Sequence, residues 1–502
     1  MSAEIDPGTG PGAAAPLQAA HSAARPAAPP APLPATLHRA LADLLGDDAV
    51  ITAPGSLLVY ESDALAAYRA RPRAVLLPTD TAAVAGAVKL LADAAIPFLA
   101  RGAGTGLSGG ALALHDAVVI STARMQRILD LDPVNRRARV QPGVVNVELS
   151  AAAAPHGLYY APDPSSQTVC TVGGNVAENA GGPHCLKYGT TANNITGLTV
   201  VLADGSVAEL RPDPTGLDLV GVFVGSEGTF GIATEVDVRL LPIPEAVETL
   251  LALFDDVDRA SHTVSAIIAA GLLPAALEMV DGEAIRAVEA SVYAAGLPTD
   301  VAGALVIEFD GTPAAVRADA AEAADICRLG GARTVERARD EAHRQRLWYA
   351  RKKAFGAMGR LAPDVLVQDA VVPRSRLPAT LRTIYAIADR HGLRMCNMFH
   401  AGDGNLHPTI VLDSRDPDLL HRVEEASREM MRACVDAGGS ITGEHGVGLD
   451  KRDYMEMIFT DSEMSAMCDI RRAFDPTGLA NPGKILPVRT CREWAGPVTR
   501  IT

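Results

Sequence analysis

Apolar and polar positions follow different patterns in the two halves of the chain. Between residues 37 and 244, short apolar runs typical of strands are separated by polar stretches rich in glycine. Between residues 245 and 478, apolar runs alternate with longer segments whose apolar positions recur every three or four residues, as in amphipathic helices. The proline-containing segment 241–244 separates the two patterns. We therefore predict two domains, 37–244 and 245–478.

The same pattern predicts the individual elements. Thr79, Asp80 and Thr81 can cap a helix that follows them, and Asp204-Gly205 between two apolar runs indicates a tight hairpin turn. In the first domain we expect helices at 37–45 and 82–94 and strands at 74–78, 95–100, 117–122, 197–202, 206–210 and 234–240. In the second domain we expect strands at 250–254, 304–309, 395–400 and 406–412 and helices at 260–270, 314–329, 340–361, 377–391 and 417–437.

The two ends of the chain differ from both domains. Residues 1–36 are rich in alanine and proline and lack periodicity, so we expect them to be disordered. Residues 479–502 contain the sequence Asn481-Pro482-Gly483-Lys484 and are expected to return to the first domain.

A glycine-rich loop at 101–110 is the first candidate binding site. Five glycines in ten residues allow the backbone N–H groups to converge on an anion, with Arg101 at the edge of the loop. The spacing of Gly104, Gly106 and Gly109 matches a Rossmann fingerprint, but the strand expected at 117–122 leaves no room for the helix that a Rossmann unit requires. We therefore predict a strand–loop–strand unit that binds a pyrophosphate in another way, with a glycine-rich surface turn as the alternative. Two further glycine-rich regions follow at 162–182 and 225–232.

Two histidines and a Glu-His pair are the candidate chemical groups of the second domain. We interpret His400 and His407 as facing each other across two strands joined by a six-residue turn, roughly 5 Å apart at Cβ, with Thr409 on the face of His407. Two imidazoles held in this way suit a divalent metal, and Glu444 could be the third ligand, leaving an open position. His445 could then act as a base. The alternatives are unrelated histidines beside a polar turn and a solvated loop.

The helix expected at 340–361 provides a candidate group for binding a carboxylate. Its face opposite the apolar stripe carries Trp348, Arg351 and Phe355. We choose Arg351, because a guanidinium matches a carboxylate with two parallel hydrogen bonds.

Composition limits the classes of partner. The formal net charge of −15 argues against binding to nucleic acid or to an anionic membrane. The sequence has no apolar run long enough for a transmembrane segment and no basic region followed by an apolar core, as a secretory signal would have. Its seven cysteines form neither CxxC nor CxxCH, so we expect no iron–sulfur cluster or c-type haem in this chain.

In combination, these motifs resemble the flavoprotein family of glycolate oxidase D subunits, D-lactate dehydrogenases and D-2-hydroxyglutarate dehydrogenases. The resemblance covers about residues 40 to 487 and is strongest to the glycolate oxidase D subunits. The motifs that carry it are 101–110, 162–166, 171–175, 179–182, 225–229, 351–355, 400–407, 443–446 and 481–484.

The resemblance implies an α+β fold with an FAD-binding domain of the vanillyl-alcohol-oxidase (PCMH) type and a ferredoxin-like cap domain. It implies that His400, His407 and Glu444 hold zinc, manganese or iron, that His445 abstracts a proton and that Arg351 binds a carboxylate. The residues that it assigns to FAD are Arg101, Gly102, Ala103, Gly104, Thr105, Gly106, Ser108, Gly109, Gly110, Pro162, Asp163, Ser165, Ser166, Thr171, Gly173, Gly174, Asn175, Asn179, Gly182, Gly225, Glu227, Gly228, Gly231, Ile232 and Asn481.

Departures from the family pattern refine these expectations. The loop 101–110 has no histidine to which a flavin could be attached, so we expect non-covalent FAD. Thr409 and Phe355 stand where D-2-hydroxyglutarate enzymes carry asparagine and threonine, which argues against a long dicarboxylate substrate.

The resemblance implies oxidation of a small D-2-hydroxy acid, such as glycolate or D-lactate, to the 2-oxo acid. Electrons would pass to a soluble acceptor or to a partner, with a second flavin-binding subunit and an iron–sulfur subunit as candidates. We expect a cytoplasmic protein that reaches the inner membrane only through such partners. A metal-dependent hydrolase of nucleotide substrates and a non-catalytic flavin-binding subunit are the alternatives. A non-catalytic flavin-binding subunit would be indicated by the loss of Arg351 or His445, and both residues are present.

Overall fold

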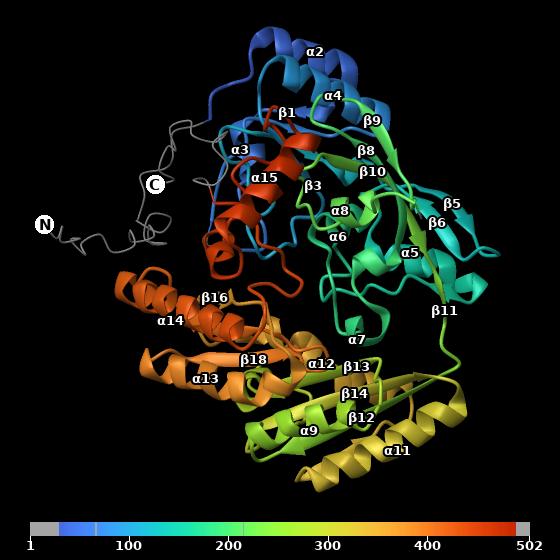
Figure 1. The fold of residues 1–502 in the computed structure, drawn as a ribbon, viewed down its shortest axis with the longest axis vertical. Coiled ribbons are helices and arrows are strands. Elements are labelled where there is room, and N and C mark those ends of the chain that lie inside the picture. Colours follow the sequence, from blue (N-terminus) through green and yellow to red (C-terminus); the bar gives the residue numbers. More distant parts are fainter. Residues whose placement is uncertain (1–29, 66–67, 214, 488–502) are drawn as a thin grey trace, which may run out of the picture.

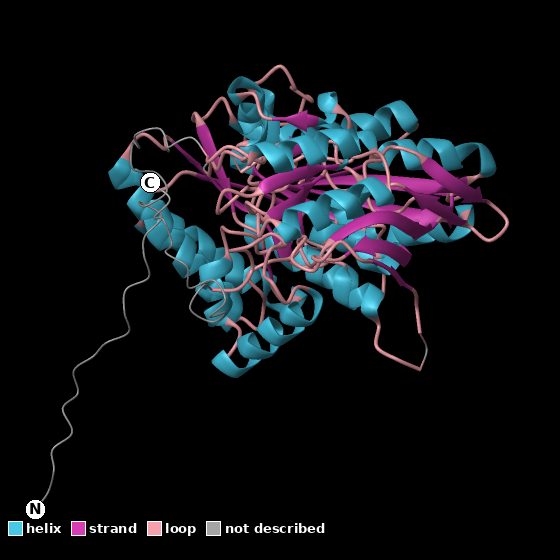
Figure 2. Cartoon of the chain, turned by 90° about the horizontal axis from the view of Figure 1, so that it is seen from above, coloured by secondary structure: helices cyan, strands magenta, loops and turns pink. Residues whose placement is uncertain are grey.

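The computed structural model describes residues 30–65, 68–213 and 215–487, and Figure 1 shows their arrangement. Most of the tail predicted to be disordered, residues 1–29, and the C-terminal residues 488–502 lie outside the described ranges. Figure 2 shows helices on both sides of the strands. Among the described residues, no helix combines the length and the apolar character needed to cross a bilayer.

A four-stranded sheet forms the N-terminal part of the first domain. Its strand order is β1-β2-β4-β3, and β2, β4 and β3 run parallel to one another. The strands and covering helices are β1 (Val50–Ile51), β2 (Val75–Leu76), β3 (Phe98–Arg101), β4 (Val118–Ser121), α2 (Ala35–Leu45) and α4 (Thr81–Asp93). The predicted cap of α4 is present, because the Asp80 side chain accepts a hydrogen bond from the Ala83 N–H at 2.9 Å. No residue between β3 and β4 is helical, in agreement with the rejection of a Rossmann unit.

A five-stranded antiparallel sheet completes the first domain. Its order is β5-β6-β10-β8-β9, and the predicted Asp204-Gly205 turn joins β8 to β9, with Gly205 at φ +84°. The strands are β5 (Ile128–Asp132), β6 (Arg137–Val140), β8 (Ile195–Val201), β9 (Val207–Leu210) and β10 (Ile232–Arg239). The smaller elements of this domain are α3 (Pro54–Leu57), α5 (Asn146–Ala153), β7 (Leu158–Tyr159), α6 (Val172–Glu178), α7 (Cys185–Tyr188), α8 (Leu219–Phe223) and β11 (Leu241–Pro242).

The second domain is built on a larger mixed-length sheet of order β15-β12-β14-β13-β18-β19-β17, with β20 pairing to β18 and β16. Its strands are β12 (Ala246–Phe254), β13 (Ala276–Asp281), β14 (Gly303–Gly311), β15 (Thr334–Arg337), β16 (Asp364–Val367), β17 (Ala370–Val371), β18 (Met395–His400), β19 (Asn405–Leu406) and β20 (Pro408–Leu412). Its helices are α9 (Val257–Ala269), α10 (Gly282–Glu289), α11 (Pro313–Leu329), α12 (Glu341–Met358), α13 (Leu377–Arg390) and α14 (Pro417–Asp436), and α15 (Asp461–Phe474) follows them.

Helices cover both faces of this sheet, as the continuous apolar character of β12 requires. Leu250, Ala252 and Phe254 point to one face and pack with α9, α11, α13 and α14. Leu251 and Leu253 point to the other face, where α10 and α12 pack. The helix α12 therefore lies on the face of the sheet opposite to α9 and α11.

The turn between β18 and β20 differs from its prediction. His400 pairs with Asn405, so the turn contains four residues rather than six, and His407 is not directly opposite His400. The pairing of Asn397 with Pro408 and of Cys396 with Thr409 continues the same register. Residues two apart share a face, so His400, His407 and Thr409 still point to the same side of the hairpin.

The segment after α15 lies against the first domain. Ala480 forms a parallel bridge with Phe98 of β3, and the Asn481 N–H donates to the Phe98 carbonyl at 2.8 Å. The buried Lys484 Nζ donates to the carbonyls of Leu112 at 2.7 Å and Gly110 at 3.2 Å. Residues 481–484 thus hold the end of the first glycine loop in place. The domain boundaries, 37–244 and 245–478, remain predictions.

Candidate active site

The first glycine loop begins directly after β3 and turns tightly around a buried arginine. Arg101 Nη2 donates to the Ser62 carbonyl at 2.9 Å, and its guanidinium carbon lies 5.8 Å from the centre of the Tyr60 ring. Gly104 has φ +70°, and a Cβ at this position would overlap the Arg101 guanidinium. The arginine therefore holds the loop in shape as well as bordering the space in front of it.

The second glycine region contains a short helix, α6, that the sequence pattern did not predict. Gly173 and Gly174 lower the helix propensity of this stretch, but the Thr171 Oγ1 caps the helix by accepting the Gly174 N–H at 3.3 Å. A Cβ on Gly173 would collide with Pro142, whose Cα and carbonyl oxygen both lie 3.0 Å from that position. Close packing against Pro142 thus requires glycine at position 173, although glycine disfavours the helix that forms there.

The three glycine regions and the second domain line one cavity of about 610 Å³. The side from the second domain includes Arg351, His407, Thr409, Glu444 and His445. The residues assigned to FAD that line it are Arg101, Gly102, Ala103, Gly104, Thr105, Gly106, Gly110, Ser165, Ser166, Thr171, Gly173, Gly174, Asn175, Glu227, Gly228, Gly231 and Ile232. The two groups of candidate residues therefore face each other across one space.

The cavity contains polar atoms that fit a polar ligand. Among the described residues, Asn175 Nδ2 and Ser226 Oγ are buried without a hydrogen-bond partner, and both residues line the cavity. Glycine backbone on one side and these orphaned groups suit a dinucleotide such as FAD. Ser226 was not among the predicted residues, although it lies between two of them, Gly225 and Glu227.

Eight residues assigned to FAD stand outside the cavity lining, and two of them, Ser108 and Asn481, hold neighbouring loops through hydrogen bonds. The Ser108 carbonyl accepts the N–H groups of Leu449 and Asp450 at 2.9 and 3.0 Å, and Asn481 Nδ2 donates to the carbonyls of Gly110 and Glu227 at 3.0 and 2.7 Å. These eight residues are Ser108, Gly109, Pro162, Asp163, Asn179, Gly182, Gly225 and Asn481.

Glu227 connects the third glycine region to the loop that carries Glu444 and His445. Its Oε1 and Oε2 accept the N–H groups of Val447 and Gly448, each at 2.7 Å. Burial raises the pKa of Glu227, although these two hydrogen bonds lower it. One buried carboxylate therefore fixes the loop 443–448 relative to the first domain.

His400, His407 and Glu444 converge in the second domain. His400 Nε2 lies 3.0 Å from Glu444 Oε1, His407 Nε2 lies 3.5 Å from the same oxygen, and the two imidazole centres are 5.2 Å apart. Both histidines are buried, and the His407 Nε2 lacks a hydrogen-bond partner among the described residues. Two imidazole nitrogens and one carboxylate oxygen at this spacing fit a divalent cation.

A second group of His and Asp side chains lies beside this cluster, and its carboxylate is already paired with a lysine. Asp369, His407 and His445 also lie close together, but Lys451 Nζ donates to Asp369 Oδ2 at 2.9 Å and to its carbonyl at 2.8 Å. Burial raises the pKa of Asp369, but Lys451 together with His445 and His407 outweighs this effect and holds that pKa well below its usual range. Asp369 also accepts backbone N–H groups of Gly443 and His445, both at 3.0 Å. Its role is therefore to organise the loop 443–445.

His445 lies beside the cluster with its ring stacked on His407, the centres 4.9 Å apart and the planes at 21°. Burial lowers the pKa of His445 to about 4, so the imidazole is neutral near pH 7. Its Nδ1 has no hydrogen-bond partner among the described residues. A neutral imidazole that lines the cavity with a free nitrogen can accept a proton.

Arg351 reaches the cavity from α12 and is buried. Its Nε donates to Glu278 Oε2 at 2.8 Å, and Glu278 Oε1 lies 2.7 Å from His400 Nδ1. Burial raises the pKa of Glu278, but His400 and Arg351 outweigh it and lower that pKa. A guanidinium held by its Nε presents its terminal nitrogens to an anion.

Besides Ser226, three charged residues beside this site were missed from the sequence: Glu278, Asp369 and Lys451. Glu278 and Asp369 each stand alone within an apolar run that forms, or directly precedes, a buried strand. A charged residue in such a position is almost always paired, and this signal could have identified both carboxylates. Lys451 had no comparable signal, because it follows a loop in an otherwise polar stretch.

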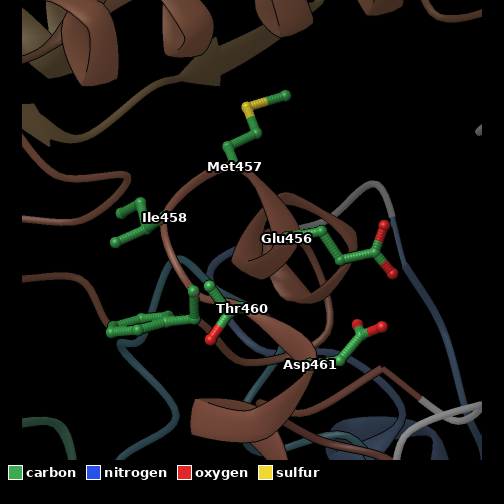
Figure 3. A pocket seen from close by; sticks show the side chains of 6 residues that line it. Glu456, Met457, Ile458, Thr460 and Asp461 are labelled. Carbon is green, nitrogen blue, oxygen red and sulfur yellow. The ribbon is translucent and has the colours of Figure 1, made fainter.

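A separate pocket lies at the connection between the 3₁₀ helix 452–457 and α15 (Figure 3). It is lined by Glu456, Met457, Ile458, Phe459, Thr460 and Asp461. Thr460 caps α15 through Glu463, so its hydroxyl is already used by the helix. This pocket has no residue in common with the candidate active site.

Family models match most of the described chain. The model "FAD binding domain" matches residues 72–211, and the model "FAD linked oxidases, C-terminal domain" matches residues 243–485. Glycolate oxidase subunit GlcD of Escherichia coli (strain K12) is 47% identical over 442 residues, which cover 87% of this chain and 88% of that relative. The chain belongs to the FAD-linked oxidase family.

Other members of the FAD-linked oxidase family are also similar over most of their length. GlcD of Bacillus subtilis (strain 168) is 42% identical, covering 85% of this chain and 92% of that relative. A D-lactate dehydrogenase of Anaerostipes hadrus is 33% identical with the same coverage. The predicted resemblance is thereby confirmed, and this chain is an FAD-linked oxidoreductase.

Solved structures confirm the fold class predicted for this FAD-linked oxidase. A p-cresol methylhydroxylase superposes with a TM-score of 0.75 at 17% identity, covering 90% of this chain and 97% of that chain. A 4-ethylphenol oxidase from Gulosibacter chungangensis has a TM-score of 0.72 at 20% identity, covering 91% and 98% of the two chains. The fold is therefore shared with proteins of much lower sequence identity.

Proposed function

We propose that this protein oxidises a small D-2-hydroxy acid, glycolate or D-lactate, to the corresponding 2-oxo acid. One observation carries the proposal: Arg351, His445 and two members of the metal cluster, His407 and Glu444, line the same cavity as the glycine regions, and His400 lies directly behind them. The names of the relatives, glycolate oxidase subunit and D-lactate dehydrogenase, support this substrate class.

The chain's own residues divide the work of the reaction. Arg351 binds the substrate carboxylate through its terminal nitrogens and so orients C2 toward the glycine regions. His445, neutral because it is buried, accepts the hydroxyl proton. Non-covalent FAD supplies the acceptor for the hydride that leaves C2, and a divalent cation held by His400, His407 and Glu444 supplies a Lewis acid for the hydroxyl oxygen.

Electrons leave the protein for a partner subunit or for a soluble acceptor. Relatives described as subunits of glycolate oxidase support a partner, for which a second flavin-binding subunit and an iron–sulfur subunit are the candidates. Association with the inner membrane would then occur through such partners.

Anaerobic flavin reduction tests the proposed activity. The purified protein should be yellow, and its flavin absorbance should bleach on addition of glycolate or D-lactate but not of D-2-hydroxyglutarate. Bleaching by none of a panel of 2-hydroxy acids would make the protein a non-catalytic flavin subunit, and a colourless protein would favour the hydrolase.

Removal of metal tests the role of the cation. Treatment with a chelator should leave the flavin bound but abolish bleaching, and Zn²⁺, Mn²⁺ or Fe²⁺ should restore it. Full bleaching after the metal has been removed would show that the cation has no part in the reaction.

A further inference from the structure

A buried carboxylate lies between the two groups that would recognise the substrate. Glu278 occupies the middle of β13 and is fully buried. It is the direct cross-strand partner of His400 on β18, so the two side chains point to the same face. The helix α12 packs on that face and brings Arg351 to the same carboxylate.

Each oxygen of Glu278 has a different partner. Oε1 lies 2.7 Å from His400 Nδ1, and Oε2 accepts the Arg351 Nε–H at 2.8 Å. The first partner belongs to the metal cluster, and the second is the carboxylate-binding arginine. One side chain thus contacts both halves of substrate recognition without lining the cavity itself.

These contacts determine how both partners present their remaining nitrogens. A carboxylate on Nδ1 favours the His400 tautomer with its proton on Nδ1, which leaves Nε2, 3.0 Å from Glu444 Oε1, as the atom that would bind a cation together with that oxygen. A hydrogen bond through Nε fixes the plane of the Arg351 guanidinium and leaves its terminal edge for an anion. Among the described residues, the Nε–Glu278 contact is the one hydrogen bond recorded for Arg351.

We propose that Glu278 is a positioning residue that sets the metal ligand His400 and the anion-binding Arg351 relative to each other. Glu278 thereby fixes the distance between the metal site, which would bind the substrate hydroxyl, and Arg351, which would bind the substrate carboxylate. An acid with these two groups on adjacent carbons can then bind at both positions together. This inference rests on the proposed function.

A neighbouring glutamate provides a matched control. Glu308 lies on the adjacent strand β14, is buried, and accepts hydrogen bonds from Arg344 and Trp348 of α12 at 2.7 Å. It bonds the same helix as Glu278 but touches neither the metal cluster nor the cavity lining. Loss of a buried carboxylate–arginine pair is therefore common to both glutamates, and contact with His400 is not.

The test measures metal affinity in the FAD-loaded protein. Glu278→Gln keeps the size of the side chain but offers a single oxygen to two donors, so one contact is lost. We expect the dissociation constant for Zn²⁺, read by competition with a chromophoric chelator, to rise about 10- to 100-fold. The KM for glycolate or D-lactate should rise with it. Glu308→Gln should leave the affinity for Zn²⁺ within error of wild type.

The outcomes separate positioning from a general structural role. Unchanged Zn²⁺ affinity in Glu278→Gln, or an equal loss in Glu308→Gln, would overturn the proposal. If Glu278→Gln does not fold, Glu278→Asp takes its place: it keeps the charge but withdraws it by one methylene, and it should show the same weakened Zn²⁺ affinity. The metal measurement uses no substrate, so failure of the proposed oxidation in wild type would be recognised separately.

Discussion

At the scale of single residues, the site depends on one neutral imidazole and on one guanidinium held in a fixed orientation. His445 is buried against the ring of His407, and burial lowers its pKa to about 4. The Arg351 Nε lies 2.8 Å from the Glu278 carboxylate, which orients the guanidinium. Burial therefore prepares His445 to accept a proton, and the contact with Glu278 prepares Arg351 to bind an anion.

Replacement of His445 by alanine removes the proposed proton acceptor. His445→Ala should retain FAD but reduce the rate constant of flavin reduction by the substrate about 10²- to 10⁴-fold. Stopped-flow absorbance under anaerobic conditions measures that rate. His421→Ala, on the exposed face of α14, is the control and should reduce at the wild-type rate. Wild-type reduction by His445→Ala would remove the proposed role.

Replacement of Arg351 by lysine keeps the charge and removes the planar fork. Loss of a charge-assisted hydrogen bond costs about 1.5–3 kcal/mol, so Arg351→Lys should raise KM about 10- to 100-fold. Steady-state kinetics with an artificial electron acceptor measure this. Arg346→Lys, at an exposed position of the same helix, should leave KM unchanged. An unaltered KM in Arg351→Lys would place the carboxylate elsewhere.

Residue types and local spacing were enough to select His400, His407, Glu444, His445 and Arg351 as candidates. They could not reveal which residues pair with Glu278 and Asp369, because the partners of these carboxylates come from distant segments. The spacing between Glu278 and Arg351 is 73 positions, and that between Asp369 and Lys451 is 82. Such contacts depend on the sheet order, which local patterns do not specify.

At the scale of elements, patterns of apolar residues predicted most of the long helices and strands, although they missed α15 and β13, and they predicted the glycine-rich segments poorly. The helix α6 was missed because Gly173 and Gly174 oppose helix formation, and its cap and its packing on Pro142 outweigh that propensity. The turn after His400 was predicted to contain six residues but contains four, because apolar alternation does not show where strand pairing begins. In the structure, pairing begins with His400 and Asn405.

The two glycines of α6 should respond differently to alanine. A Cβ on Gly173 meets Pro142 backbone atoms, whereas a Cβ on Gly174 meets only the Thr171 Oγ1 at 3.3 Å. Gly173→Ala should lower the free energy of unfolding by about 1–3 kcal/mol, as overpacking does. Gly174→Ala should be neutral or stabilising, since alanine favours helix by about 1 kcal/mol. Urea unfolding of the FAD-free protein measures both, and equal destabilisation would contradict this account.

At the scale of the whole molecule, the two domains are joined by partly buried charged and polar groups as well as by the chain. His184, just before α7, lies 2.7 Å from Asp163 of the first domain and 3.4 Å from Glu308 of the second. Tyr188 of α7 donates to Asp310 at 2.6 Å, and Lys187 also contacts that carboxylate. The short helix α7 therefore fastens the first domain to the C-terminal end of β14 (Figure 1).

The contribution of His184 to stability should depend on pH. Burial lowers the pKa of His184, but Asp163 and Glu308 outweigh it and raise that pKa to about 10. A pKa raised above the unfolded value of about 6.5 stabilises fully below pH 6.5, and the effect is lost as pH rises toward 10. The difference in Tm between wild type and His184→Gln should therefore be largest at pH 6 and shrink by pH 10. A constant difference across that range would contradict the assignment.

The Glu227 carboxylate has a bearing on how the holoenzyme matures. Because a residue of the dinucleotide-binding region holds the N–H groups of Val447 and Gly448, three and four residues after Glu444, a newly made chain that has not taken up its flavin should hold its third metal ligand less firmly. Loading should then be ordered, with flavin uptake first and metallation second. In a cell short of riboflavin, the metal-free apoprotein would accumulate even when the cation is abundant.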